Sequence, residues 1–113
     1  MLIFVPKETL KVTSGTTPVE KIRVAVIEDE ALFREMLVSS LSRQVGLEVV
    51  GTADNAEEAI ALAQNAKPDV ILMDIELAGE MDGIEAALAI KRESPEIGIK
   101  EYRCVRISVT ERR

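Results

Sequence analysis

The sequence contains no histidine and only one cysteine, and both features limit the chemistry that the chain can carry out. A single cysteine cannot form an internal disulfide, so we expect a reducing compartment. A cysteine nucleophile also needs an activating group such as histidine, which is missing here. We therefore interpret Cys104 as a small apolar packing residue rather than a catalytic one.

Long apolar runs are absent as well. The opening run, residues 1–5, is too short for the hydrophobic region of a signal sequence, and no segment approaches membrane-spanning length. The formal net charge of −6 argues against a nucleic-acid groove or an anionic membrane surface as the main partner. We expect a soluble cytoplasmic protein that makes no direct contact with nucleic acid or membrane.

Two short apolar runs do occur, and each of them ends on carboxylates. Residues 70–73 lead directly into Asp74, and residues 24–27 lead into Glu28 and Asp29. A continuous apolar run of this length suits a strand that is buried on both faces of a parallel sheet. The carboxyl ends of such strands line the ligand crevice of open α/β sheets. Asp74 is therefore the leading candidate for a functional residue.

Predicted strands and helices alternate along a chain of 113 residues, a length that suits one domain. Residues 1–20 include a Thr- and Ser-rich stretch and are interpreted as a flexible N-terminal extension. Alternation with short connections implies an α/β fold with a doubly wound parallel sheet. The predicted segments are a strand at 24–27, a helix from residue 33 to a C-cap at Gly46, a strand at 47–52, a helix capped by Asp54 or Asn55, a strand at 70–73 and a helix at 84–93.

Three carboxylates meet at one edge of the sheet if the two apolar strands are parallel neighbours. Each pair of like charges about 4 Å apart then costs about 4 kcal/mol at an effective dielectric constant of about 20. Protonation of one group or binding of a hard divalent cation such as Mg²⁺ relieves this repulsion. Mg²⁺ beside an aspartate also supports phosphoryl transfer. The alternative interpretation is that these acids are ordinary solvated loop or N-cap residues.

The acidic strand ends belong to three separated motifs, which are Lys-Ile-Arg-Val-Ala-Val-Ile-Glu-Asp-Glu at 21–30, residues 69–76, and Met-Asp-Gly-Ile-Glu-Ala-Ala at 81–87. In this order the motifs resemble the receiver domain of bacterial two-component response regulators. The resemblance implies a flavodoxin-like receiver fold over residues 21–99. It also implies phosphorelay signalling as the function, with a sensor histidine kinase or a phosphotransfer protein as the partner.

The same resemblance implies a role for each of four acidic residues. Asp74 matches the phospho-acceptor of the family. Glu28 and Asp29 match the acidic pair that binds Mg²⁺, with Asp29 as a direct ligand and Glu28 acting through water. Glu76 occupies the position whose backbone carbonyl completes the metal site.

The sequence departs from the family pattern after residue 99. A receiver continues with a strand that ends in a phosphoryl-binding Ser or Thr, and a later strand ends in a lysine, whereas residues 100–113 read as a divergent basic tail or an edge strand. Ser108 or Thr110 could supply the hydroxyl, but no lysine follows Lys100. We therefore expect a fold that is incomplete at its C-terminal end, a weakened or absent switching output, and self-association through uncovered apolar surface.

Two other functions fit parts of the same pattern. One is a phosphorylation-independent binding module derived from a receiver. The other is a haloacid dehalogenase-like phosphatase, because Asp74 and Glu76 are separated by one residue, although the further acids and the lysine of that class are missing. Without histidine the chain has no phosphohistidine of its own. We therefore predict an acceptor of phosphate from outside, and not a turnover enzyme.

Overall fold

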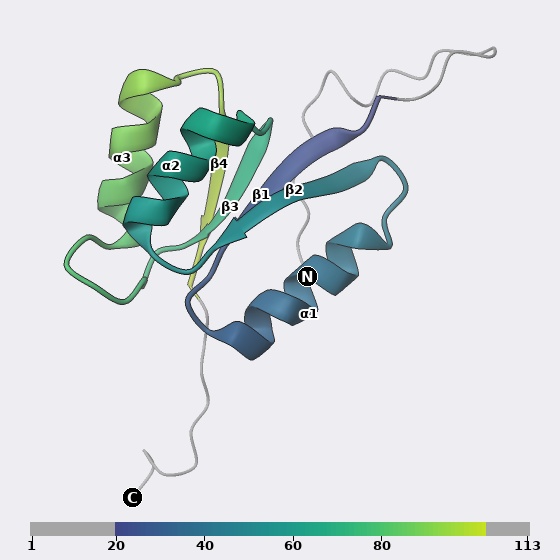
Figure 1. Ribbon diagram of the computed structural model, residues 1–113, viewed down its shortest axis with the longest axis horizontal. Helices are drawn as coiled ribbons and strands as arrows, with labels where there is room; N and C mark the ends of the chain where they lie inside the picture. The colour runs from purple at the N-terminus through teal and green to yellow at the C-terminus, as the bar shows by residue number, and fades with distance from the viewer. Residues whose placement is uncertain (1–19, 104–113) are drawn as a thin grey trace, which may run out of the picture.

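The computed structural model describes residues 20–103, which form a four-stranded parallel sheet with helices on both faces (Figure 1). The strand order is β2-β1-β3-β4, so β1 and β3 are the central strands. The fold class predicted from the alternating pattern is confirmed. The elements are β1 (Ile22–Ile27), α1 (Ala31–Ser42), β2 (Leu47–Ala53), α2 (Ala56–Ala66), β3 (Val70–Asp74), α3 (Gly83–Glu93) and β4 (Gly98–Tyr102).

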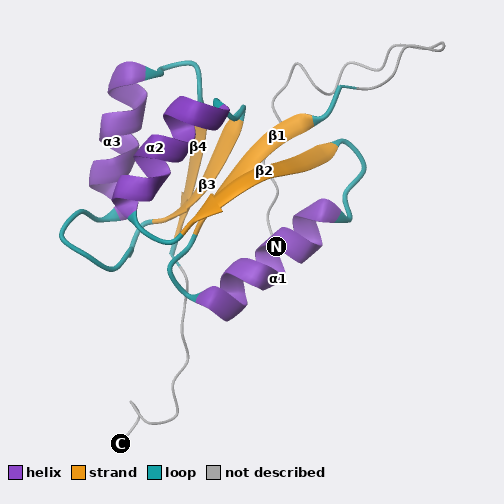
Figure 2. Cartoon of the chain, in the orientation of Figure 1, coloured by secondary structure: helices purple, strands orange, loops and turns teal. Residues whose placement is uncertain are grey.

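The two central strands divide the core into two layers because successive side chains of a strand point to opposite faces. One set of residues on β1 and β3 packs against α2 and α3, namely Ala25, Ile27, Ile71 and Met73. The alternate set packs against α1, namely Val24, Val26, Val70 and Leu72. Figure 2 shows the sheet as a layer between α1 on one side and α2 and α3 on the other. Burial on both faces explains why these strands are continuous apolar runs.

Side-chain caps begin the second and third helices. The Asn55 side chain accepts a hydrogen bond from the Glu58 amide, so Asn55 rather than Asp54 is the N-cap of α2. Asp82 caps α3 in a capping box with Glu85, in which each side chain accepts from the other residue's backbone amide. These caps place both helix starts directly after the loops that follow β2 and β3.

The first helix ends earlier than its apolar spacing predicts. The C-cap is Arg43 and not Gly46, because the Arg43 amide donates to the Ser40 carbonyl and tightens the last turn. Gly46 lies in the following turn with a φ of +94°, a conformation that glycine adopts easily. Its carbonyl accepts a hydrogen bond of 2.7 Å from the Ile22 amide, which joins this turn to the start of β1.

The fourth strand, β4, lies where the sequence departs from the family pattern. It starts at Gly98 and therefore crosses the boundary predicted after residue 99. The Gly98 amide donates to the Asp69 carbonyl and the Ile75 amide donates to the Tyr102 carbonyl, so both ends of β4 are joined to β3 or its flanks. Residues 104–113, with Ser108, Thr110 and Cys104, lie outside the described part of the chain. No helix between residues 20 and 103 has the length and apolar content that a membrane crossing requires.

Candidate functional site

The acids that end the two central strands meet at one edge of the sheet. Glu28 and Asp29 follow β1, and Asp74 ends β3, whose residues pair with those of β1 in parallel register up to Ile27 and Met73. Each acid places one carboxylate oxygen so that the three atoms lie within 4.8 Å of one another. Glu28 and Asp74 are fully buried, while Asp29 is partly exposed. The structure thus brings together three of the four acids singled out in the sequence.

Backbone amides hold all three carboxylates in place. Oδ1 of Asp74 accepts a hydrogen bond of 3.0 Å from the Glu76 amide, and Oδ2 of Asp29 accepts one of 3.1 Å from the Ala78 amide. Oε2 of Glu28 accepts one of 3.0 Å from the Glu30 amide. Such bonds stabilise ionised carboxylates. The loop after β3 therefore folds back over the acidic site and fixes two of its members.

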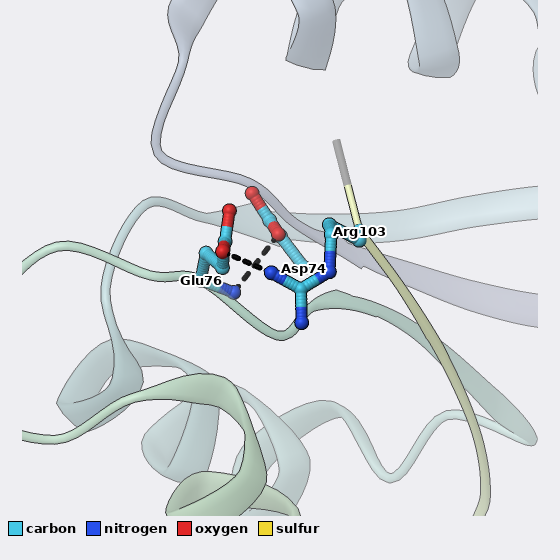
Figure 3. A network of polar contacts seen from close by, with 3 residues as sticks. All are labelled: Asp74, Glu76 and Arg103. Carbon is cyan, nitrogen blue, oxygen red and sulfur yellow. Dashed lines mark hydrogen bonds and ion pairs between the residues drawn. The ribbon is translucent and has the colours of Figure 1, made fainter. Parts of the chain in front are cut away.

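Glu76, the fourth acid, lies in that loop, and its carboxylate is not one of the three that meet. Its side chain is about half exposed and forms an ion pair with the guanidinium of Arg103, just beyond β4 (Figure 3). Its backbone amide, in contrast, donates to Asp74. Glu76 therefore contacts Asp74 through its main chain, while its carboxylate binds Arg103.

The Glu28 carboxyl is in an unusual electrostatic environment. Burial is the main reason that its pKa lies above the ordinary value, and the charge of Asp74 and a hydrogen bond with Asp29 raise the pKa further. Hydrogen bonds from the Tyr102 hydroxyl and the Glu30 amide oppose this rise. Burial next to other acids therefore raises the affinity of the Glu28 carboxyl for a proton.

Gly83 allows the start of α3 to approach the end of β3 closely. A Cβ atom at this position would lie 2.2 Å from the Asp74 carbonyl oxygen and 2.7 Å from the Ile75 Cα. The Gly83 amide also donates to the Ile75 carbonyl at 3.2 Å. Glycine is thus required by sterics next to the end of β3.

Tyr102 and Arg103 belong to the site but were not among the residues predicted from the sequence. Tyr102 is in register with Asp74 and donates a hydrogen bond of 2.7 Å to Oε1 of Glu28. Arg103 follows it and binds Glu76. The available signal was chemical: Tyr102 is the only tyrosine, and a half-buried phenol needs a hydrogen-bond partner.

The family model of the response regulator receiver domain matches residues 24–105. The chain belongs to this receiver domain family. A protein-glutamate methylesterase/protein-glutamine glutaminase from Alkalilimnicola ehrlichii is 47% identical over 75 residues, which are 66% of this chain and 19% of that protein. The response regulator VraR from Staphylococcus aureus is 44% identical over 78 residues, which are 69% of this chain and 37% of that protein.

A solved structure agrees with this assignment. The signal receiver domain of the response regulator NarL from Mycobacterium tuberculosis superposes with a TM-score of 0.63 at 40% identity, covering 73% of this chain and 64% of that one. As a receiver domain, the chain serves phosphorelay signal transduction, and receiver domains interact with histidine kinases or phosphotransfer proteins. The comparisons favour neither the receiver-derived binding module nor the haloacid dehalogenase-like phosphatase.

The receiver domain spans only part of the two relatives, 19% and 37% of their lengths. Receiver domains in general are not turnover enzymes, although the first relative carries the name of one. The second is named as a response regulator. Activities named for these longer proteins therefore describe them and not the segment shared with this chain.

Proposed function

We propose that Asp74 accepts a phosphoryl group from the phosphohistidine of a sensor histidine kinase or a phosphotransfer protein. A carboxylate oxygen of Asp74 forms a bond to phosphorus while the phosphorus–nitrogen bond breaks, and the departing imidazole keeps the electron pair and takes up a proton. The observation that supports this role is the position of Asp74 at the end of β3, with its carboxylate within 4.8 Å of those of Glu28 and Asp29.

The chemistry of the donor set fits Mg²⁺ as the cofactor. Three carboxylates and no nitrogen or sulfur ligand make up the cluster, and Mg²⁺ prefers oxygen ligands and keeps several waters. We propose Asp29, Asp74 and the backbone carbonyl of Glu76 as direct ligands, with Glu28 acting through water. When bound, the cation neutralises charge that develops on the transferring phosphoryl group.

We also propose limits to what this module does. The candidate hydroxyls of Ser108 and Thr110 lie outside the described residues, so no residue of the described part is assigned to a conformational switch after phosphorylation. In this proposal the chain is an acceptor module without turnover, located in the cytoplasm, with proteins rather than nucleic acid as its direct partners.

Incubation with acetyl phosphate and Mg²⁺, followed by intact mass measurement, tests the acceptor role. We expect the mass of one added phosphoryl group in the unaltered chain and none in Asp74→Asn. Asp69→Asn is the matched control, because Asp69 lies just before the other end of β3, where its side chain accepts from the Arg23 amide. Equal phosphorylation of Asp74→Asn and the unaltered chain, or none in either, would overturn the proposal.

A further inference from the structure

Arg103 is brought to the acidic edge of the sheet by the register of β4. Tyr102, the last residue of β4, pairs with Asp74, and its carbonyl accepts a hydrogen bond of 2.9 Å from the Ile75 amide. The next residue, Arg103, therefore emerges beside the loop that follows the acceptor. Its guanidinium binds the Glu76 carboxylate, and the Glu76 amide binds Asp74 (Figure 3).

The ion pair that holds Arg103 can be exchanged at little cost. The Arg103 and Glu76 side chains are 60% and 52% exposed, so water and salt screen their attraction. Arg34, another arginine near the site, instead donates to the main-chain carbonyl of Glu28 at 2.7 Å. Arg103 is therefore an arginine near the acceptor whose partner is a weakly held side chain.

Phosphorylation changes the charge that this corner of the molecule must balance. Phosphorylated Asp74 carries more negative charge than the free carboxylate, and it lies beside the buried Glu28 and the half-buried Asp29. A guanidinium has several N–H groups in one plane and binds two phosphate oxygens at once, which makes it a better partner for phosphate than for one screened carboxylate.

We propose that Arg103 exchanges Glu76 for the phosphoryl group on Asp74 and so supplies positive charge that balances the added negative charge. The inference rests on the proposed phosphorylation of Asp74. Arg103 is then a phosphoryl-binding residue contributed by the edge strand, while the acids come from the two central strands. Its effect is on the phosphorylated state, and Mg²⁺ binding does not depend on it.

Titration calorimetry with beryllofluoride, a mimic of the phosphoryl group, in the presence of Mg²⁺ tests the inference. We expect Arg103→Gln to weaken beryllofluoride binding about tenfold, because one charge-assisted hydrogen-bonding partner is lost. The affinity of Arg103→Lys for beryllofluoride should lie between those of the unaltered chain and Arg103→Gln, since lysine keeps the charge and lacks the planar set of donors. Arg43→Gln, which removes an exposed arginine just beyond the last turn of α1, is the matched control and should bind as the unaltered chain does.

Titration of the same variants with Mg²⁺ alone separates a specific effect from a damaged site. Removing a cation beside three acids leaves Mg²⁺ binding unchanged or tighter, so Arg103→Gln should weaken the anion and spare the cation. Equal beryllofluoride binding by Arg103→Gln and Arg43→Gln, or a parallel loss of Mg²⁺ binding, overturns the inference. If the unaltered chain neither binds beryllofluoride nor gains a phosphoryl group from acetyl phosphate, the proposed function itself fails.

Discussion

The Tyr102 hydroxyl donates a hydrogen bond of 2.7 Å to Oε1 of Glu28, which joins the end of β4 to the end of β1 across the intervening β3. The tyrosine ring also meets Phe33 of α1 edge to face, with ring centres 6.1 Å apart. One side chain of the edge strand thus contacts both a buried acid and the helix that follows it. Tyr102 is therefore a structural link between the acidic site and α1.

Replacing Tyr102 with phenylalanine separates these two contacts. Phenylalanine keeps the ring beside Phe33 and removes the donor to a buried carboxylate, so we expect a loss of about 1 to 2 kcal/mol in the free energy of unfolding. Tyr102→Ala removes both contacts and should cost more. Urea denaturation in the presence of a chelator measures both values. Equal stability of Tyr102→Phe and the unaltered chain would show that the hydroxyl contributes nothing.

The raised pKa of Glu28 predicts an unusual dependence of stability on pH. A carboxyl whose pKa is higher in the folded state than its ordinary value of 4.5 binds more protons when folded. Its contribution to stability is therefore complete below about pH 4.5 and declines as the pH rises through the raised pKa. Glu28→Gln cannot titrate, so without metal its stability should fall less over this range than that of the unaltered chain.

Mg²⁺ should oppose this decline, because the proposed metal site favours the ionised carboxylates. We expect the Mg²⁺-induced rise in melting temperature to grow as the pH increases from about 4.5 towards neutrality. Thermal melts of the unaltered chain and Glu28→Gln, with Mg²⁺ and with chelator, measure both effects. A Mg²⁺ effect that is the same at every pH would contradict the assignment of a raised pKa to this site.

Gly83→Ala should disturb the contact between α3 and the end of β3 more than an alanine at Gly79, in the loop between them. The new Cβ would lie 2.2 Å from the Asp74 carbonyl oxygen, which is backbone and cannot move aside without shifting β3 or α3. We expect a loss of about 2 to 4 kcal/mol in unfolding free energy. Gly79→Ala is the control, since its φ of +111° imposes strain but no atom lies within 4 Å of its Cβ position. Denaturation curves that rank Gly79→Ala as the more harmful change would refute the steric argument.

An apolar face beside β4 predicts self-association. Among residues 20–103, β4 pairs only with β3, and next to it a hollow of about 280 Å³ lies between α3 and the strand. Leu88, at 60% exposure, lines this hollow. Exposed apolar surface and an open strand edge both favour association. Sedimentation velocity should show concentration-dependent oligomers. Leu88→Lys should reduce them, whereas Leu32→Lys, on α1 at the other face of the sheet, should not.

The central part of the site could be predicted from sequence because burial and register leave little freedom there. Two neighbouring parallel strands bring their carboxyl ends to one edge of the sheet, so Glu28, Asp29 and Asp74 lie close together. Tyr102 and Arg103 could not be found in this way. Tyr102 ends β4, and Arg103 follows it. The residues of this edge strand are mostly only partly buried, so its sequence is not a continuous apolar run. The bond from Tyr102 to Glu28 also spans 74 residues of sequence, beyond the reach of local patterns.

The end of α1 shows a related limit. Apolar spacing continues past Ser42, and Gly46 suits a helix terminus, but the helix stops at Arg43. Hydrogen bonds of the last turn set the end of the helix, because the Arg43 amide donates to the Ser40 carbonyl. Helix boundaries depend on such local bonds more than on which face is apolar. The existence and face of α1 were thus predictable, while its exact length was not.

The strand order determines which part of the site opens first in local unfolding. The acids lie at the ends of β1 and β3, which have neighbours on both sides. Tyr102 ends β4, which forms one margin of the described sheet, and Arg103 follows it. Local opening starts where fewest contacts hold the backbone, so amide protons of β4 should exchange with solvent before those of β1 and β3. Local unfolding of β4 would move the Tyr102 hydroxyl and the Arg103 guanidinium away from the site together. The three carboxylates on the central strand ends would stay in place. The positive charge next to the acidic site would then come and go at the rate at which β4 opens and closes.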